Sequence, residues 1–149
     1  MSQADWDLRF LLLARHVSTW SKDPSTQCGA VITQGKRIRS LGFNGFPQGI
    51  SDAPEDYTDR DLKYAQVVHA EANALLFADG NTEGCTVYVW PFQPCSTCAA
   101  MLIQARITRV VTLVPDEERL KRWEDSFKVS ARMFDQAGVS LDFLELPAE

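Results

Sequence analysis

The sequence predicts an α/β protein in which helices alternate with strands around a largely parallel sheet that begins with an antiparallel hairpin. Composition supports a folded protein, because 45% of the 149 residues are apolar and 23% are charged. The apolar pattern changes repeatedly between helical and strand spacing. No internal repeat, low-complexity tract or linker divides the chain. We therefore expect a single domain over residues 1–149, long enough to bury a substantial core.

The first third of the chain is expected to contain a helix, a hairpin and a loop. Residues 5–20 carry apolar side chains at helical spacing. The segment Lys22–Thr26 forms a turn, because Asp-Pro disfavours helix and Ser-Thr favours loops. Strands over 28–33 and 37–43 follow, joined by a short Gln-Gly-Lys connection. Residues 44–54 contain several Gly and Pro residues and therefore form a loop.

The rest of the chain alternates helices with strands. Gly80 and Gly138 are expected to end two of the helices. The expected elements are helices over 69–78, 95–104 and 116–137 and strands over 86–90, 109–114 and 139–146. The resulting order is α-β-β-α-β-α-β-α-β, in which the later strands are parallel.

Charge, hydropathy and cysteine content narrow the functional classes. Twenty acidic and fifteen basic residues give a net charge of −5, whereas non-specific nucleic-acid binders usually carry excess Lys and Arg, so a nucleic-acid partner is not expected. No run approaches the ~20 apolar residues of a membrane span. The N-terminus lacks a basic secretory region, so we expect a cytoplasmic protein. Four cysteines are too few for a disulfide framework, and Cys-x-x-Cys therefore indicates metal or redox chemistry.

The strongest functional signal is a candidate metal site of His69, Cys95 and Cys98. Two cysteines three residues apart lie on one side of a helical turn, where both thiolates reach one ion. A histidine from a neighbouring helix adds a third ligand. Sulfur and imidazole ligands favour zinc. Three protein ligands leave the fourth tetrahedral position free, which distinguishes a catalytic zinc from a structural one.

Glu71 gives this site a catalytic interpretation. On a helix, it cannot share the direction of His69 two residues earlier, which makes it a poor fourth ligand. Its carboxylate is instead suited to carrying a proton between water and a leaving group.

A redox pair and a closed structural zinc site are also possible interpretations of the cysteine motif. A closed site needs a fourth ligand from His16, Cys28 or Cys85. Cys28 and Cys85 begin apolar strands and are expected in the core, and His16 is expected on a helix surface. The catalytic zinc site is therefore favoured.

The pattern His-Ala-Glu … Pro-Cys-x-x-Cys resembles the zinc-dependent cytidine and deoxycytidylate deaminases. Within that superfamily, the segments 21–30, 42–49 and 69–74 are most similar to the deoxycytidylate (dCMP) deaminases. The similarity extends from Lys22 to about Val111. It implies a three-layer α/β/α sandwich around a central five-stranded mixed sheet.

The resemblance also implies a reaction and a set of residue roles. The reaction is hydrolytic deamination of dCMP to dUMP and ammonia, with one Zn²⁺ on His69, Cys95 and Cys98 and with Glu71 as the catalytic proton carrier. The implied substrate contacts are Ala70 through its backbone N–H to the pyrimidine O2, Asn44 to the sugar hydroxyl, and Lys22, Ser25 and Thr26 to the phosphate. A turn is the structural alternative for Asn44 and for the Lys22–Thr26 loop, and Phe77 borders the base pocket or packs in the core.

Regulation and assembly are further implications of the resemblance. The loop containing Gly45 and Pro47 is similar to a loop through which dCTP and dTTP act in many dCMP deaminases, with Mg²⁺ accompanying the regulatory nucleotide. A homo-oligomer, a hexamer or a dimer, is also implied. The aromatic residues of the last helix fit either an interface or packing on the sheet; they are Trp123, Phe127 and Phe134. Residues 51–68 contain no Cys or His, so a second zinc is not expected.

The choice of dCMP as substrate is challenged by the acidic segment Asp116–Glu118. Its charge would repel a phosphate beside it, which favours a free nucleoside, a base or a modified nucleotide as substrate. Acidic residues also favour a helix N-terminus, which explains the same segment without a role in recognition. A polynucleotide-editing deaminase and a non-catalytic zinc module stay open as well.

Overall fold

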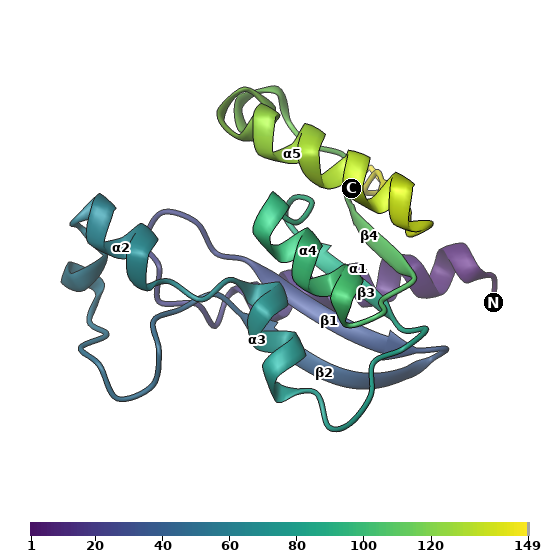
Figure 1. Cartoon of the computed structure of the whole chain (residues 1–149), viewed down its shortest axis with the longest axis horizontal. Coiled ribbons are helices and arrows are strands. Elements are labelled where there is room, and N and C mark those ends of the chain that lie inside the picture. The colour runs from purple at the N-terminus through teal and green to yellow at the C-terminus, as the bar shows by residue number, and fades with distance from the viewer. Residues whose placement is uncertain (149) are drawn as a thin grey trace.

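Five strands form one mixed sheet in the order β2-β1-β3-β4-β5 in the computed structural model, which describes residues 1–148 (Figure 1). The strands are β1 Gly29–Gln34, β2 Arg37–Phe43, β3 Thr86–Trp90, β4 Arg109–Leu113 and β5 Ser140–Leu144. The helices are α1 Gln3–Ser18, the 3₁₀ helix η1 Pro54–Tyr57, α2 Arg60–Gln66, α3 Ala70–Phe77, α4 Ser96–Gln104 and α5 Glu117–Ala137.

Only β1 runs opposite to the other four strands of the sheet. The first hairpin is antiparallel, and β1 also pairs antiparallel with β3. The pairs β3–β4 and β4–β5 are parallel, each crossing through one helix. The sheet is therefore the expected combination of a hairpin and a parallel half.

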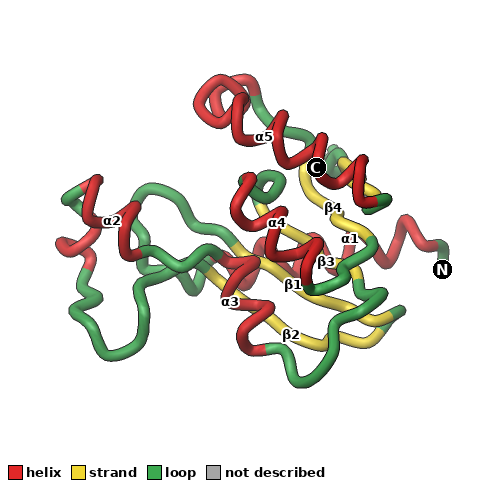
Figure 2. The backbone as a smooth tube through the Cα atoms, in the orientation of Figure 1, coloured by secondary structure: helices red, strands yellow, loops and turns green. Residues whose placement is uncertain are grey.

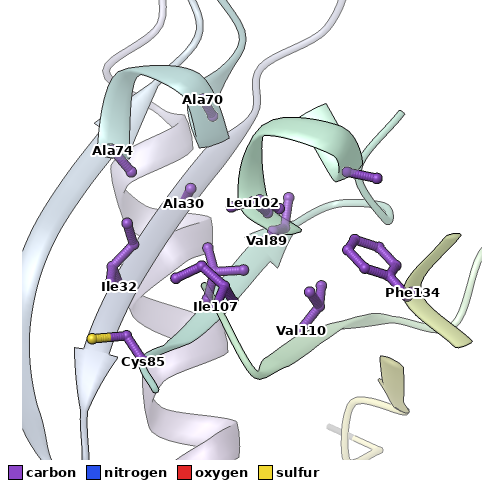
Figure 3. Packing of buried hydrophobic residues seen from close by; sticks show 12 residues of the cluster. Ala30, Ile32, Ala70, Ala74, Cys85, Val89, Leu102, Ile107, Val110 and Phe134 are labelled. Atoms are coloured by element: carbon purple, nitrogen blue, oxygen red, sulfur yellow. The ribbon is translucent and has the colours of Figure 1, made fainter. Parts of the chain in front are cut away.

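Helices cover both faces of the sheet, which gives three layers (Figures 1 and 2). On one face α1 packs Phe10 and Leu11 against Val31 and Val111. On the other face α3, α4 and α5 cover a larger cluster that includes Ile32 and is shown in Figure 3. Alternate residues of β1 point to opposite faces, as the pleat requires. The predicted three-layer α/β/α sandwich is confirmed.

Two glycines allow helices to approach the hairpin closely. A Cβ atom at Gly29 would collide with the backbone of α1 at Ala14. A Cβ atom at Gly42 would collide with the backbone of α3 at Ala70 and Ala74. Because only glycine removes this atom, Gly42 fixes how closely α3 lies on β2. The start of α3 is therefore held firmly against the sheet.

The expected elements are found with boundary shifts of at most two residues, and one region differs. The sequence pattern predicts no helix or strand over residues 51–68, yet they contain η1 and α2. These elements form an extension beyond the sheet, at the left of Figure 1. His69 is not inside a helix but precedes α3 as its N-cap residue, because Val68 pairs with Gly45 in an isolated bridge. Within residues 1–148, no helix has the length and apolar character needed to span a membrane.

Candidate metal centre and active site

A pocket lies at the end of the sheet where strand β1 begins and strand β3 ends, beside the first turns of α3 and α4. Ligands in open α/β sheets commonly bind at the ends of strands in this way. His69, Glu71 and Cys95 line the pocket together with residues of α2 and α5. The pocket thus receives contributions from segments more than 50 residues apart.

The three predicted metal ligands meet at this pocket. His69 and Cys95 are the N-cap residues of α3 and α4, and Cys98 lies in the first turn of α4. The Nδ1 atom of His69 is 3.5 Å from Cys95 Sγ and 3.3 Å from Cys98 Sγ. All three donor atoms lie within 4.8 Å of one another.

This arrangement fits a tetrahedral zinc site. Typical zinc bond lengths place a sulfur and a nitrogen ligand about 3.6 Å apart across a tetrahedral angle, close to the two distances observed. A thiolate is the metal-binding form of cysteine. The pKa of the Cys95 thiol is lowered by a hydrogen bond from Cys98 and, against the effect of burial, by His69. Within residues 1–148, no other group of three or more His, Cys, Asp or Glu side chains converges in this way.

Glu71 lies in the first turn of α3, 5% exposed, and lines the same pocket. Burial raises its pKa above the usual range, and the neighbouring His69 opposes that shift. A raised pKa helps a carboxyl group both to accept and to release a proton near neutral pH. Glu71 is outside the group of convergent metal donors, as expected from its spacing.

Three of the predicted substrate contacts line the pocket: Asn44, Ala70 and Thr26. Ala70 is the first residue of α3, and the first N–H groups of a helix have no acceptor within it. The Asn44 side chain is 6% exposed. Its Oδ1 accepts a hydrogen bond from the Cys28 N–H at 2.8 Å, and its Nδ2 donates to the Thr26 carbonyl at 2.9 Å. Asn44 therefore also holds the 26–28 segment in place.

The other two expected phosphate contacts lie outside the pocket lining. Lys22 forms an ion pair with Asp52 at 3.3 Å, and its side chain is 61% exposed. Ser25 is exposed and donates its backbone N–H to Asp23 Oδ1 at 2.9 Å. This geometry does not support the expected contact of Lys22 and Ser25 with the phosphate. Of the three expected phosphate contacts, only Thr26 lines the pocket.

Several pocket residues were not predicted from the sequence. They are Asp23, Lys63, Tyr64, Val67, Phe92 and Arg122. Lys63 pairs with Asp23 at 2.8 Å, and both side chains are almost completely buried. Residues of α2 carry no clear periodicity, and Arg122 resembles any exposed helical arginine in the sequence. A buried lysine signals such a site only when its partner, 40 residues away, is known.

The remaining cysteines, His16 and the acidic segment occupy structural positions. Cys85 is fully buried in the core, and His16 is exposed on α1. Cys28 packs against the core and also borders the pocket. Asp116 caps α5 by accepting the Arg119 N–H at 2.8 Å, and Glu117 and Glu118 are exposed in its first turn. The helix N-terminus explains the acidic segment.

The large aromatic residues also have defined positions. Phe127 and Phe134 are buried under α5, so they pack within the chain. Trp123 stacks with Phe92 at a centroid distance of 6.4 Å, and both line the pocket. Phe77 is 62% exposed and is found neither in the pocket lining nor in the core.

Comparisons with known proteins agree with this site. Residues 4–114 match the family described as the cytidine and deoxycytidylate deaminase zinc-binding region. An Aliivibrio fischeri protein described as an uncharacterized deaminase in luxG 3'region is 49% identical over 141 residues, covering 95% of both chains. A probable deoxycytidylate deaminase of Caenorhabditis elegans is 40% identical over 146 residues, covering 95% of this chain and 71% of that protein.

The fold has solved counterparts as well. The dCMP deaminase of cyanophage S-TIM5, solved in complex with dCMP and dUMP, superposes with a TM-score of 0.75 at 23% identity, covering 97% of this chain and 99% of the other. The residues matched by the family include His69, Glu71 and both cysteines of the Cys-x-x-Cys motif. The chain therefore belongs to the cytidine and deoxycytidylate deaminase family and carries its zinc-binding region.

Proposed function

We propose that the protein, as a single catalytic domain over residues 1–149, converts dCMP and water into dUMP and ammonia. The observation that carries this proposal is a buried carboxyl group, Glu71, beside a convergent His-Cys-Cys donor set in a pocket. The names of the relatives support dCMP as the substrate, because several of them are deoxycytidylate deaminases.

His69, Cys95 and Cys98 would hold the zinc ion, because their donor atoms converge beside the pocket. Zinc bound in such a site lowers the pKa of water to about 7 and so supplies a hydroxide nucleophile at neutral pH. The protein positions its ligands through two helix starts, since His69 and Cys95 are both N-cap residues. The site is thus built on rigid elements.

Glu71 carries the protons of the reaction. As the water oxygen bonds to C4 of the cytosine ring, the carboxylate accepts one proton and delivers it to ring N3. The second water proton follows the same route to the C4 amino group. The C4–N bond then breaks, ammonia leaves and the C4 carbonyl forms. A buried carboxyl group with a raised pKa is suited to this repeated transfer.

Other pocket groups orient the pyrimidine nucleotide. The Ala70 N–H is proposed to donate to the pyrimidine O2, since it begins α3 and points from a helix N-terminus. Asn44 is proposed to meet the sugar hydroxyl with the hydrogen-bonding capacity left after its two loop contacts. Phe92 and Trp123 provide an apolar wall that excludes water.

The first test measures ammonia release by the zinc-loaded protein with dCMP, CMP, deoxycytidine, cytosine and guanine. We expect dCMP to be turned over with the highest kcat/KM. Preference for an uncharged substrate would remove dCMP as the substrate and leave deamination standing. Binding of single-stranded oligonucleotides at low salt in a gel shift would instead favour a polynucleotide substrate.

The second test replaces Glu71 by Gln. Because the amide cannot accept the water proton, we expect kcat to fall by about 10²–10⁴-fold, with zinc still bound in stoichiometric amount. Glu118→Gln is the matched control: Glu118 is exposed on α5 and should leave kcat unchanged. Unchanged activity in Glu71→Gln would contradict the mechanism and favour a non-catalytic zinc module.

Assembly and regulation are part of the same proposal. We propose a cytoplasmic homo-oligomer, a hexamer or a dimer; the exposed Leu76 and Phe77 at the end of α3 support the assembly. Regulation by dCTP and dTTP, with Mg²⁺, is supported by the backbone pairing of Gly45 with Val68. Val68 directly precedes His69, so a movement of the Gly45–Pro47 loop would shift His69. Light scattering and dCMP turnover with each triphosphate test these two points.

A further inference from the structure

A hydrogen bond to one tyrosine hydroxyl connects helices α2 and α5 beside the pocket. Arg122 donates its Nη2–H to Tyr64 Oη at 2.7 Å, and Arg60 donates its Nε–H to the same oxygen at 3.3 Å. Tyr64 and Arg122 both line the pocket that contains His69 and Glu71. The N-terminal end of α5 lies on the α2 side of the sheet in Figure 1.

The positive charge of these arginines is not balanced by an ion pair. Among residues 1–148, no carboxylate lies within 4.0 Å of the guanidinium of Arg60 or Arg122. Two other nearby cations are paired: Lys63 pairs with Asp23, and Arg119 pairs with Asp116 at 3.5 Å. Two cations without an ion pair therefore converge on the hydroxyl of Tyr64, which lines the pocket with Arg122, while Arg60 approaches it from outside the pocket lining.

The hydroxyl completes a set of donors. A phenol oxygen accepts two hydrogen bonds and keeps one proton to donate. Because the arginines supply both accepted bonds, the proton of Tyr64 is free to point to a third group. Each guanidinium also retains further N–H donors. Burial opposes ionisation of Tyr64, yet the two arginines hold the pKa of its phenol below the usual range.

The Lys22–Thr26 loop lacks such a donor set. Asp23 is 2% exposed, and its carboxylate accepts the backbone N–H groups of Ser25 and Thr26 as well as the Lys63 ammonium. The N–H groups that could have cradled an anion are therefore already used. The carboxylate also places a negative charge on this wall of the pocket.

We infer that Arg60, Tyr64 and Arg122 form the anion-binding site that recognises the phosphate of the nucleotide, so that α2 and α5 hold the substrate between them. This inference rests on the proposed function, since it assigns a substrate group within the same pocket. Guanidinium groups bind phosphate oxygens with charge-assisted hydrogen bonds. Specificity for a nucleotide over a nucleoside would then depend on α2 and α5 and not on Lys22.

Binding of dUMP and deoxyuridine tests the inference without requiring turnover. The two ligands differ only by the phosphate, and isothermal titration gives their dissociation constants with the zinc-loaded protein. We expect Arg122→Gln to weaken dUMP binding by at least about tenfold and to leave deoxyuridine binding unchanged. Arg60→Gln and Tyr64→Phe should show smaller losses restricted to dUMP.

Lys121→Gln is the matched control, because it removes a charge from the neighbouring position of α5 that does not line the pocket. If Lys121→Gln weakens dUMP binding as much as Arg122→Gln, or if Lys22→Gln does so instead, the inference is overturned. Equal affinity of the unmodified protein for dUMP and deoxyuridine also overturns it. Loss of dUMP binding in Arg122→Gln in a protein that does not deaminate dCMP would support the anion site and refute the proposed function.

Discussion

Two nearly inaccessible aspartates, each held by one basic side chain, occupy different regions of the molecule. Asp7 on α1 accepts two hydrogen bonds from Arg109 at 2.8 and 2.7 Å, one from Tyr88 at 2.7 Å and one from Gln3 at 2.9 Å. Asp23 accepts the Lys63 ammonium at 2.8 and 3.0 Å and two backbone N–H groups. Both carboxylates are therefore fully supplied with donors.

The surroundings of the two pairs differ. The Asp7 pair joins α1 to β3 and β4, and Asp142 extends it to β5 through Arg109 at 2.8 Å. None of these residues lines the pocket. Asp23 and Lys63 both line it, and they connect α2 to the loop that precedes β1. A buried ion pair by itself does not mark a functional site; its position beside the pocket does.

Removing the basic residue of each pair should distinguish a pair that only stabilises the fold from one that also shapes the pocket. Arg109→Met and Lys63→Met each leave a buried carboxylate without its cation, and we expect each to lower the free energy of unfolding by about 3–5 kcal/mol. Lys63→Met should also raise KM for dCMP, because α2 would lose its ion pair with Asp23 across the pocket. Arg109→Met should leave kcat/KM unchanged at a temperature where it remains folded. Urea unfolding and dCMP turnover measure the two effects.

Lys128→Met serves as the control for loss of a lysine. It breaks the exposed pair with Glu124, whose side chains are 72% and 52% exposed, and should change stability by less than about 0.5 kcal/mol. If Arg109→Met changed KM as much as Lys63→Met, the proposed division between the two regions would be wrong.

The sequence predicted the region around the metal site better than the region around α2. His69, Cys95 and Cys98 are recognisable because local spacing brings the two cysteines together and because few residue types bind zinc. The strands and long helices follow from apolar periodicity over many residues. Helix α2 spans only Arg60–Gln66, two turns, which is too short for a periodic pattern to be distinguished.

The proposed phosphate contacts could not be located from the sequence for a related reason. Lys22 is close in sequence to the Thr26 side of the pocket, but its charge is paired with Asp52, 30 positions later. Arg122 is distant in sequence, but Tyr64 contacts it at the pocket from another helix. Pairing between long, flexible charged side chains depends on tertiary structure, which local patterns do not contain.

The stabilising contribution of the Asp7 carboxylate should depend on pH. Burial alone would raise the pKa of Asp7, but hydrogen bonds from Arg109, Tyr88 and Gln3 lower it to about 2. A depressed pKa stabilises the fold above the unfolded-state value of 3.8, and the contribution is lost as the pH falls from about 4 to 2. We expect this contribution to be about 2 kcal/mol.

The measurement is the difference in unfolding free energy between the unmodified protein and Arg109→Met from pH 6 to pH 2. The difference should narrow through this interval, because the variant lacks the cation that depresses the pKa of Asp7. Zinc release in acid affects both proteins and cancels in the comparison. A difference that stays constant with pH would mean that Arg109 stabilises the fold through packing and not through the charge of Asp7.

Within the Asp7 cluster the smallest expected effect comes from Tyr88→Phe, which removes one of the four donors to Asp7 and keeps the ring. Losing a buried hydrogen bond to a charged group should cost about 1–2 kcal/mol, less than losing Arg109, because the cation remains. Tyr57→Phe is the matched change near α2, where the hydroxyl donates to Asp52 at 2.8 Å. An unchanged kcat/KM in Tyr88→Phe would keep the α1 face purely structural. A reduced kcat/KM would instead show that the Asp7 cluster and the pocket are energetically coupled.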